Sequence, residues 1–119
     1  MAREVVWAGR ARSDLRLAIS HIQADSPSAA RTFASAIIQS SRSLATLSER
    51  GRVVPELEQE EVRELLLGRY RMVYEVFPER VAVVRLIHAS RDLESMAWNR
   101  SLMRKSTNLV DRWRRRTRG

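Results

Sequence analysis

The sequence predicts an α+β domain in which an α-helical hairpin packs on one face of an antiparallel β-sheet. Two observations indicate this class. Apolar residues recur at three- and four-residue spacing between residues 10 and 50, as in amphipathic helices. From residue 62 to residue 88, apolar strand-like runs are separated by tight turns. The expected element order is therefore β-α-α-β-β-β, with the second face of the sheet left uncovered.

The N-terminal half is expected to form a short strand and two helices. Arg3–Trp7 is a β-type run that belongs at a sheet edge or beside the later strands. The first helix starts at Arg10, has Asp14 on its outer face, and ends before Ser26-Pro27, because a residue that precedes proline avoids the α region. Ser26 and Pro27 then cap and start the second helix, and Arg50-Gly51 is expected to end it. The apolar faces consist of Leu15, Ala18, Ile19 and Ile22 in the first helix, and Ala30, Phe33, Ile37, Leu44 and Leu47 in the second.

The C-terminal half of the predicted domain is a three-stranded meander. It follows a polar, acidic loop at Val53–Glu61, and two-residue turns at Gly68-Arg69 and Pro78-Glu79 join its strands. The predicted strands are Val62–Leu67, Tyr70–Phe77 and Val81–His88.

Cationic side chains interrupt this meander. Strand alternation places Arg71 on the sheet face opposite Tyr70 and Tyr74, a position where threonine or valine is more typical. A packed sheet that carries cations on one side is the main functional signal in the chain. The cations and the histidine of this region are Arg63, Arg71, Arg85, His88 and Arg91.

The net charge of +8 lies almost entirely at the C-terminal end. Residues 1–95 carry 14 Lys and Arg against 13 Asp and Glu, whereas residues 96–119 carry 8 against 1. We therefore expect one folded domain at residues 1–95 and a basic extension at residues 96–119. The extension, with Trp98 and Trp113, is either a solvated, partly helical tail or an arm that binds an acidic partner or nucleic acid. The near-neutral body disfavours nucleic-acid binding as the main activity.

Cysteine is absent, and no apolar run approaches the length of a membrane span or resembles a signal peptide. Disulfides and thiolate metal sites are thereby excluded, and we expect a cytoplasmic protein without membrane contact. His21 and His88 fall on different elements and lack ligand-spaced partners. We accordingly expect no metal and no cofactor.

A set of short motifs resembles the ParE/RelE superfamily of toxins from type II toxin–antitoxin modules. The resemblance runs from about Val5 to Arg91, and its ParE side is favoured by the SPxAA and PEL pieces. The motifs are Trp7-x-x-x-Ala11-x-x-Asp14-Leu15, Ser26-Pro27-x-Ala29-Ala30, Gly51-Arg52-x-x-Pro55-Glu56-Leu57, Arg63-Glu64, Tyr70-Arg71-x-x-Tyr74 and His88-x-x-Arg91.

The resemblance implies a toxin bound by a cognate antitoxin, with one of two targets. ParE-like members inhibit DNA gyrase without chemistry of their own, whereas RelE-like members cut messenger RNA on the ribosome. RNA cleavage needs a base, an acid and phosphate-binding cations. By position these are Glu56 as base, His88 as acid, and Arg63 and Arg71 as phosphate clamps. The body contains no lysine, and Ala89 follows His88 where some nucleases of the superfamily have tyrosine, so inhibition of gyrase is the first hypothesis and ribosome-dependent cleavage the alternative.

Each candidate also has a structural alternative. His88 at the end of an apolar strand is more often a hydrogen-bonded structural histidine, and Glu56 in a loop is usually solvated. Arg63 with Glu64, and Arg71 with Glu75, are candidate surface ion pairs worth under ~1 kcal/mol each. The residues expected to bind a target or partner are Arg63, Tyr70, Arg71, Tyr74, Arg91, Trp98 and Trp113.

Overall fold

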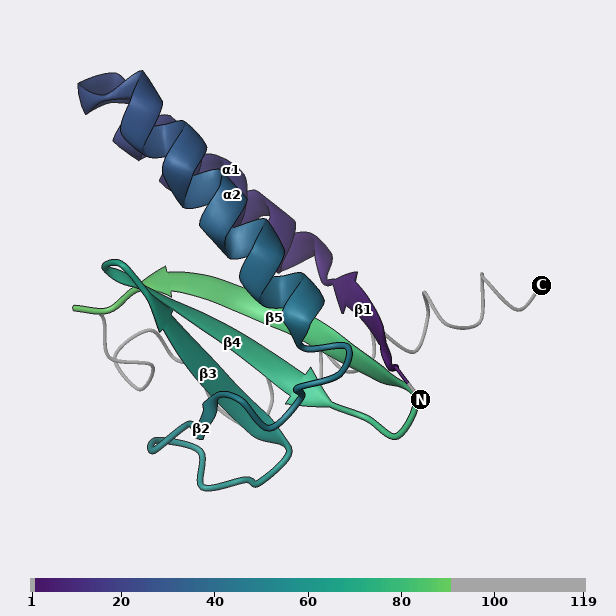
Figure 1. Cartoon of the computed structure of the whole chain (residues 1–119). Helices are drawn as coiled ribbons and strands as arrows, with labels where there is room; N and C mark the ends of the chain where they lie inside the picture. The colour runs from purple at the N-terminus through teal and green to yellow at the C-terminus, as the bar shows by residue number, and fades with distance from the viewer. Residues whose placement is uncertain (1, 91–119) are drawn as a thin grey trace.

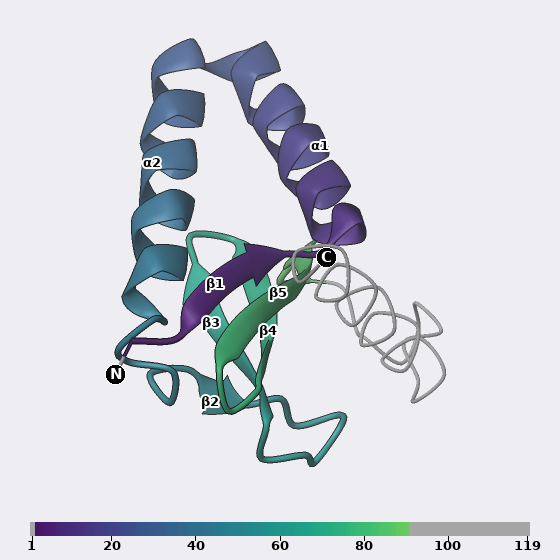
Figure 2. The ribbon, with the colours of Figure 1, turned by 90° about the vertical axis from the view of Figure 1, so that its right-hand side faces the viewer.

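Two helices lie across one face of a five-stranded sheet in the computed structural model, which describes residues 2–90 (Figure 1). The turn between the helices lies at the end of the hairpin that projects beyond the sheet, as Figures 1 and 2 both show. The expected α+β order is confirmed, with one additional short strand. The elements are β1 (Glu4–Trp7), α1 (Gly9–Asp25), α2 (Pro27–Ser43), β2 (Arg52–Val53), β3 (Val62–Leu67), β4 (Tyr70–Val76) and β5 (Arg80–His88).

The sheet is mixed, in contrast to the purely antiparallel sheet that we expected. Its strand order is β1-β5-β4-β3-β2, and β1 runs parallel to β5 while all other pairs are antiparallel. The parallel pair joins the first and the last strand of the described chain, which the two helices and the other strands separate in sequence. The meander β3-β4-β5 turns where the sequence predicted, and its first turn has a positive φ only at Gly68 (59°), as a two-residue type II′ turn requires.

Both helices form where the apolar spacing predicts them. The Ser26 hydroxyl accepts a hydrogen bond from the Ala29 N–H (3.2 Å), with Pro27 as the first residue of α2, so the predicted N-terminal cap is confirmed. The predicted end at Arg50-Gly51 is wrong, because α2 stops at Ser43. Hydroxyls in its last turn donate to backbone carbonyls, including Ser43 to Ser40 (2.6 Å), and such bonds compete with helix continuation.

Apolar side chains are buried on both faces of the sheet. The face under the helices holds Tyr74, Val81 and Val83 against Ile37 and Leu44. The opposite face is not open at its centre, so the expectation of an uncovered face is wrong there. Its buried cluster consists of Val54, Val62, Val73, Ala82, Val84 and Ile87, with Leu57 and Phe77 packed against it. Val54 and Leu57 come from the segment before β3, which was expected to be a polar loop.

The outer edge of β5 changes partner partway along its length. Pairing with β1 ends at Val83, and a β-bulge at Val84 follows in the pairing with β4. Beyond the bulge, Asp14 of α1 accepts the Leu86 backbone N–H (2.9 Å) and the Arg85 Nε–H (2.7 Å). The expected solvent-facing position of Asp14 is therefore wrong: its carboxylate satisfies a strand edge that β1 is too short to cover.

Candidate functional site

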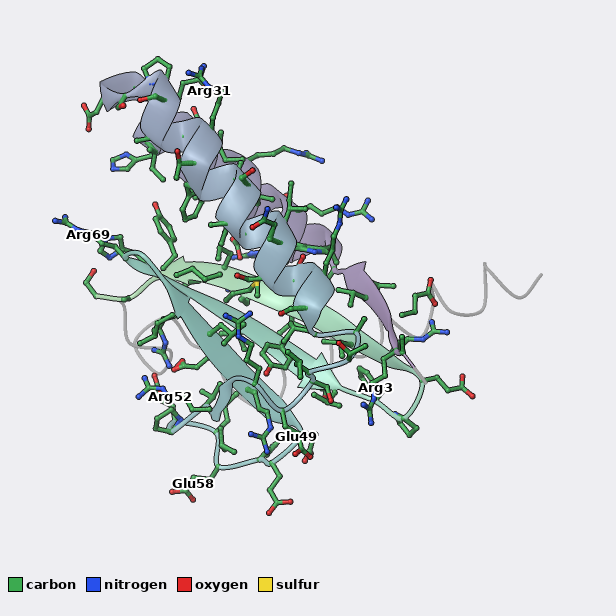
Figure 3. The ribbon with its side chains drawn as sticks, viewed as in Figure 1. Arg3, Arg31, Glu49, Arg52, Glu58 and Arg69 are labelled. Carbon is green, nitrogen blue, oxygen red and sulfur yellow. The ribbon has the colours of Figure 1, made fainter. Side chains whose placement is uncertain are left out.

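An ion-pair cluster centred on Arg71 lies on the sheet face away from the helices. Arg71 donates to both Glu64 oxygens, from Nε at 2.7 Å and from Nη2 at 2.9 Å. It also donates to both Glu56 oxygens, from Nη1 at 2.9 Å and from Nη2 at 3.0 Å. Arg52 of β2 adds a second guanidinium to Glu64 through Nη2 at 3.0 Å. Figure 3 shows Arg52 on the side of the sheet that faces away from the hairpin.

This cluster is buried and internally compensated. The side chains of Glu64 and Arg71 are 0% and 8% exposed, and that of Glu56 is 19% exposed. The hydrogen bonds that Arg71 donates to Glu56 raise the pKa of Arg71 above its ordinary value, burial acts in the opposite direction, and Glu64 raises the pKa further. Both Glu56 oxygens already accept from Arg71. Glu56 is thus a structural counter-ion that holds the segment before β3 against the sheet. The expected ion pair between Glu64 and Arg63 is wrong, because Glu64 binds Arg71 while Arg63 donates to the Gly51 carbonyl.

A second polar group lies under the helices, on the opposite face. Tyr74 donates its hydroxyl to the Ser48 carbonyl and accepts the Gly51 N–H, both at 2.8 Å. Arg63 donates to the Gly51 carbonyl at 2.9 Å. Tyr74 is fully buried, and this burial raises the pKa of its phenol. Tyr74 therefore anchors the segment after α2, and we assign it a structural role in place of partner binding.

His88 lies at the C-terminal end of β5, directly opposite Tyr70 of β4. The two rings are 5.4 Å apart between centroids, and Tyr70 also contacts Phe33 of α2 at 5.0 Å. Nδ1 of His88 accepts the Ser90 backbone N–H (3.2 Å), and the Ser90 hydroxyl lies 2.7 Å from the same nitrogen. With Nδ1 engaged by Ser90, Nε2 is the ring nitrogen left for another partner.

The four residues expected to form a nuclease site do not come together. Arg71 and Glu56 lie on one face of the sheet. Arg63 lies opposite Tyr74, and His88 lies opposite Tyr70, in neighbouring strands on the other face. Strand alternation dictates this separation, since Arg71 is one residue away from Tyr70 along β4. An acid and a base on opposite faces of one sheet cannot act on the same phosphodiester.

Sequence reasoning did not identify Arg71 as the partner of Glu64, or Asp14 and Arg85 as partners of each other. The available signal for Glu64 was its place between Val62 and Leu66 on the face that Arg71 also occupies. The expectations for Arg91, Trp98 and Trp113 lie outside the described residues. Within residues 2–90, no cluster of three or more His, Asp or Glu side chains has the geometry to hold a metal, and no helix is long and apolar enough to cross a membrane.

The fold defines a class of small α+β proteins in which a helical hairpin covers one face of a five-stranded sheet. Residues 5–93 match the family described as the ParE toxin of the type II toxin–antitoxin system parDE. The chain therefore belongs to the ParE toxin family. This match confirms the resemblance that the sequence motifs indicated.

A solved structure shares the fold. A chain of the chromosomal ParDE TA system from P. aeruginosa aligns with a TM-score of 0.62 at 20% sequence identity. The alignment covers 75% of this chain and 98% of the other. No protein with a curated description matches the sequence.

Proposed function

We propose that this chain is the toxin of a type II toxin–antitoxin module, that it acts by binding DNA gyrase, and that a cognate antitoxin neutralises it. Membership of the ParE toxin family supports the first part. The structural neighbour belongs to a ParDE TA system, which supports a protein antitoxin as partner.

The observation that carries the choice of mechanism is the position of the candidate acid and base. Glu56 is held by both of its oxygens to Arg71, and His88 lies on the other face of the sheet beside Tyr70. A ribosome-dependent ribonuclease requires groups that donate and accept protons at one phosphodiester. Glu56 and His88 cannot form such a pair, because they lie on opposite faces of the sheet, and this favours a toxin that acts through binding alone.

His88→Gln is expected to leave growth inhibition unchanged when the chain is expressed in bacterial cells. Gyrase inhibition needs no proton transfer by the toxin, whereas loss of a general acid typically costs a nuclease a factor of about 10² to 10⁴ in rate. Cells that express either form should induce a DNA-damage reporter and keep intact messenger RNA. His21→Gln, at the exposed histidine of α1, is the matched control.

Cleaved messenger RNA in cells that express the wild type, together with intact messenger RNA and normal growth with His88→Gln, would assign the chain to the ribonuclease class. Equal growth arrest by all three forms without a DNA-damage response would retain the toxin assignment and remove gyrase as the target.

A further inference from the structure

A pocket of about 430 Å³ lies between α1, the N-terminal end of β4 and the C-terminal end of β5. Arg10 and Leu17 of α1 line it on one side, and Tyr70 and His88 line it on the other. Its volume falls in the range of cavities that bind ligands. The pocket is separate from the Arg71 cluster, which occupies the other face of the sheet.

The charges around the pocket favour an anionic occupant. Asp14 also lines the pocket, but Arg85 and the Leu86 N–H already hold its carboxylate. Arg10 is exposed, and no carboxylate of residues 2–90 lies within ion-pair distance of it. The pocket thus presents one uncompensated guanidinium, a group suited to planar contacts with carboxylate.

His88 supplies a second hydrogen-bond donor. Its Nδ1 accepts from the Ser90 N–H, so Nε2–H is the nitrogen that remains for a ligand. Tyr70 packs against the His88 ring and restricts its orientation. The Arg10 guanidinium and His88 Nε2, two donors from different elements, therefore line one pocket, an arrangement that suits a carboxylate acceptor.

The pocket also has an apolar side. Leu17 is 71% exposed, the only large apolar side chain of α1 with such exposure. Leu86 and Ile87 lie along the same pocket. A small inorganic anion leaves Leu17 in water, whereas a peptide segment that pairs a carboxylate with an apolar side chain covers it.

We propose that this pocket binds an acidic peptide segment of the antitoxin, with a carboxylate between Arg10 and His88 and a neighbouring apolar side chain against Leu17. The inference rests on the proposed function, and it adds the location and the chemistry of one contact. The carboxylate gives the contact its specificity, and the apolar side chain contributes through the area that it buries on Leu17.

The test measures the dissociation constant of the full-length chain with the protein encoded by the adjacent reading frame, by isothermal titration calorimetry. Arg10→Glu is expected to raise Kd by at least about 30-fold, and Leu17→Ser by about 10-fold, because each removes a central contact. His88→Gln should weaken binding by a smaller factor. Arg16→Glu on the exposed side of α1 and Leu47→Ser after α2 are the matched controls, with Kd expected to stay within about threefold.

Growth inhibition by Arg10→Glu in the absence of antitoxin should match the wild type and thereby show that the variant is folded. A charge-reversal scan of the antitoxin should find one Asp or Glu whose change to Lys restores binding to Arg10→Glu. Equal weakening by Arg10→Glu and Arg16→Glu, or no weakening by either, would overturn the proposal. A wild-type chain that binds no antitoxin would overturn it together with the proposed function, whereas a tight wild-type complex that is insensitive to Arg10 and Leu17 overturns the pocket alone.

Discussion

Arg71→Met is expected to destabilise the fold by about 3 to 5 kcal/mol, because it leaves two carboxylates without their shared cation in a buried site. Glu64 is fully buried and Glu56 is 19% exposed, so neither gains full hydration when the guanidinium is lost. Arg52 still contacts Glu64, but its own side chain is 59% exposed, and its contribution is screened by solvent. The free energy of unfolding from urea denaturation gives the result directly.

Arg69→Met is the control for this experiment, since Arg69 lies in the exposed β3–β4 turn (Figure 3). It is expected to change stability by less than about 0.5 kcal/mol. The double variant Arg71→Met with Glu64→Gln should recover part of the loss, because it removes the buried charge that the single variant leaves unpaired. A loss below about 1 kcal/mol for Arg71→Met would mean that the cluster acts as a surface ion pair.

Gly51→Ala is expected to cost about 2 to 4 kcal/mol, from overpacking together with a disrupted buried hydrogen bond. A Cβ at this position would lie 2.5 Å from the Glu64 carbonyl oxygen and 2.6 Å from the Tyr74 hydroxyl. The first contact is to the backbone of β3, which cannot rotate away as a side chain does. The second contact is to the hydroxyl that joins the Gly51 N–H to the Ser48 carbonyl.

Gly9→Ala provides the comparison, because a Cβ at Gly9 would have no atom within 4 Å. This change at the first residue of α1 is expected to be neutral to within about 0.5 kcal/mol. Thermal or urea unfolding of the two variants beside the wild type measures the difference. Equal stability of Gly51→Ala and Gly9→Ala would show that the segment after α2 is not fixed against β3 and Tyr74.

Local periodicity was sufficient to predict most of the fold. The helical spacing around Ala18 and Ile37 and the turns at Gly68 and Pro78 each specify structure within a few residues, so the elements occur where expected. The arginine at position 71 was also recognised as unusual for a strand, but it was interpreted as a functional residue, whereas the structure places it at the centre of a buried ion-pair cluster. Its alternation placed it on the correct face, opposite Tyr70 and Tyr74.

The remaining features depend on contacts between residues far apart in the chain. Glu56 reaches Arg71 only because the segment before β3 folds back over the sheet, and Val54 and Leu57 pack there for the same reason. Asp14 turns inward because β1 is too short to cover the edge of β5. No local sequence pattern encodes the fold-back of the segment before β3 or the length of β1. Glu56 and Asp14 were therefore expected to face solvent.

The most direct test of a toxin that acts by binding is DNA supercoiling by purified gyrase, titrated with the purified chain and with His88→Gln. We predict that both forms inhibit supercoiling with the same concentration dependence, and that neither cleaves messenger RNA on purified ribosomes. Ribosome-dependent cleavage by the wild type that His88→Gln abolishes, with supercoiling unaffected by either form, would contradict it.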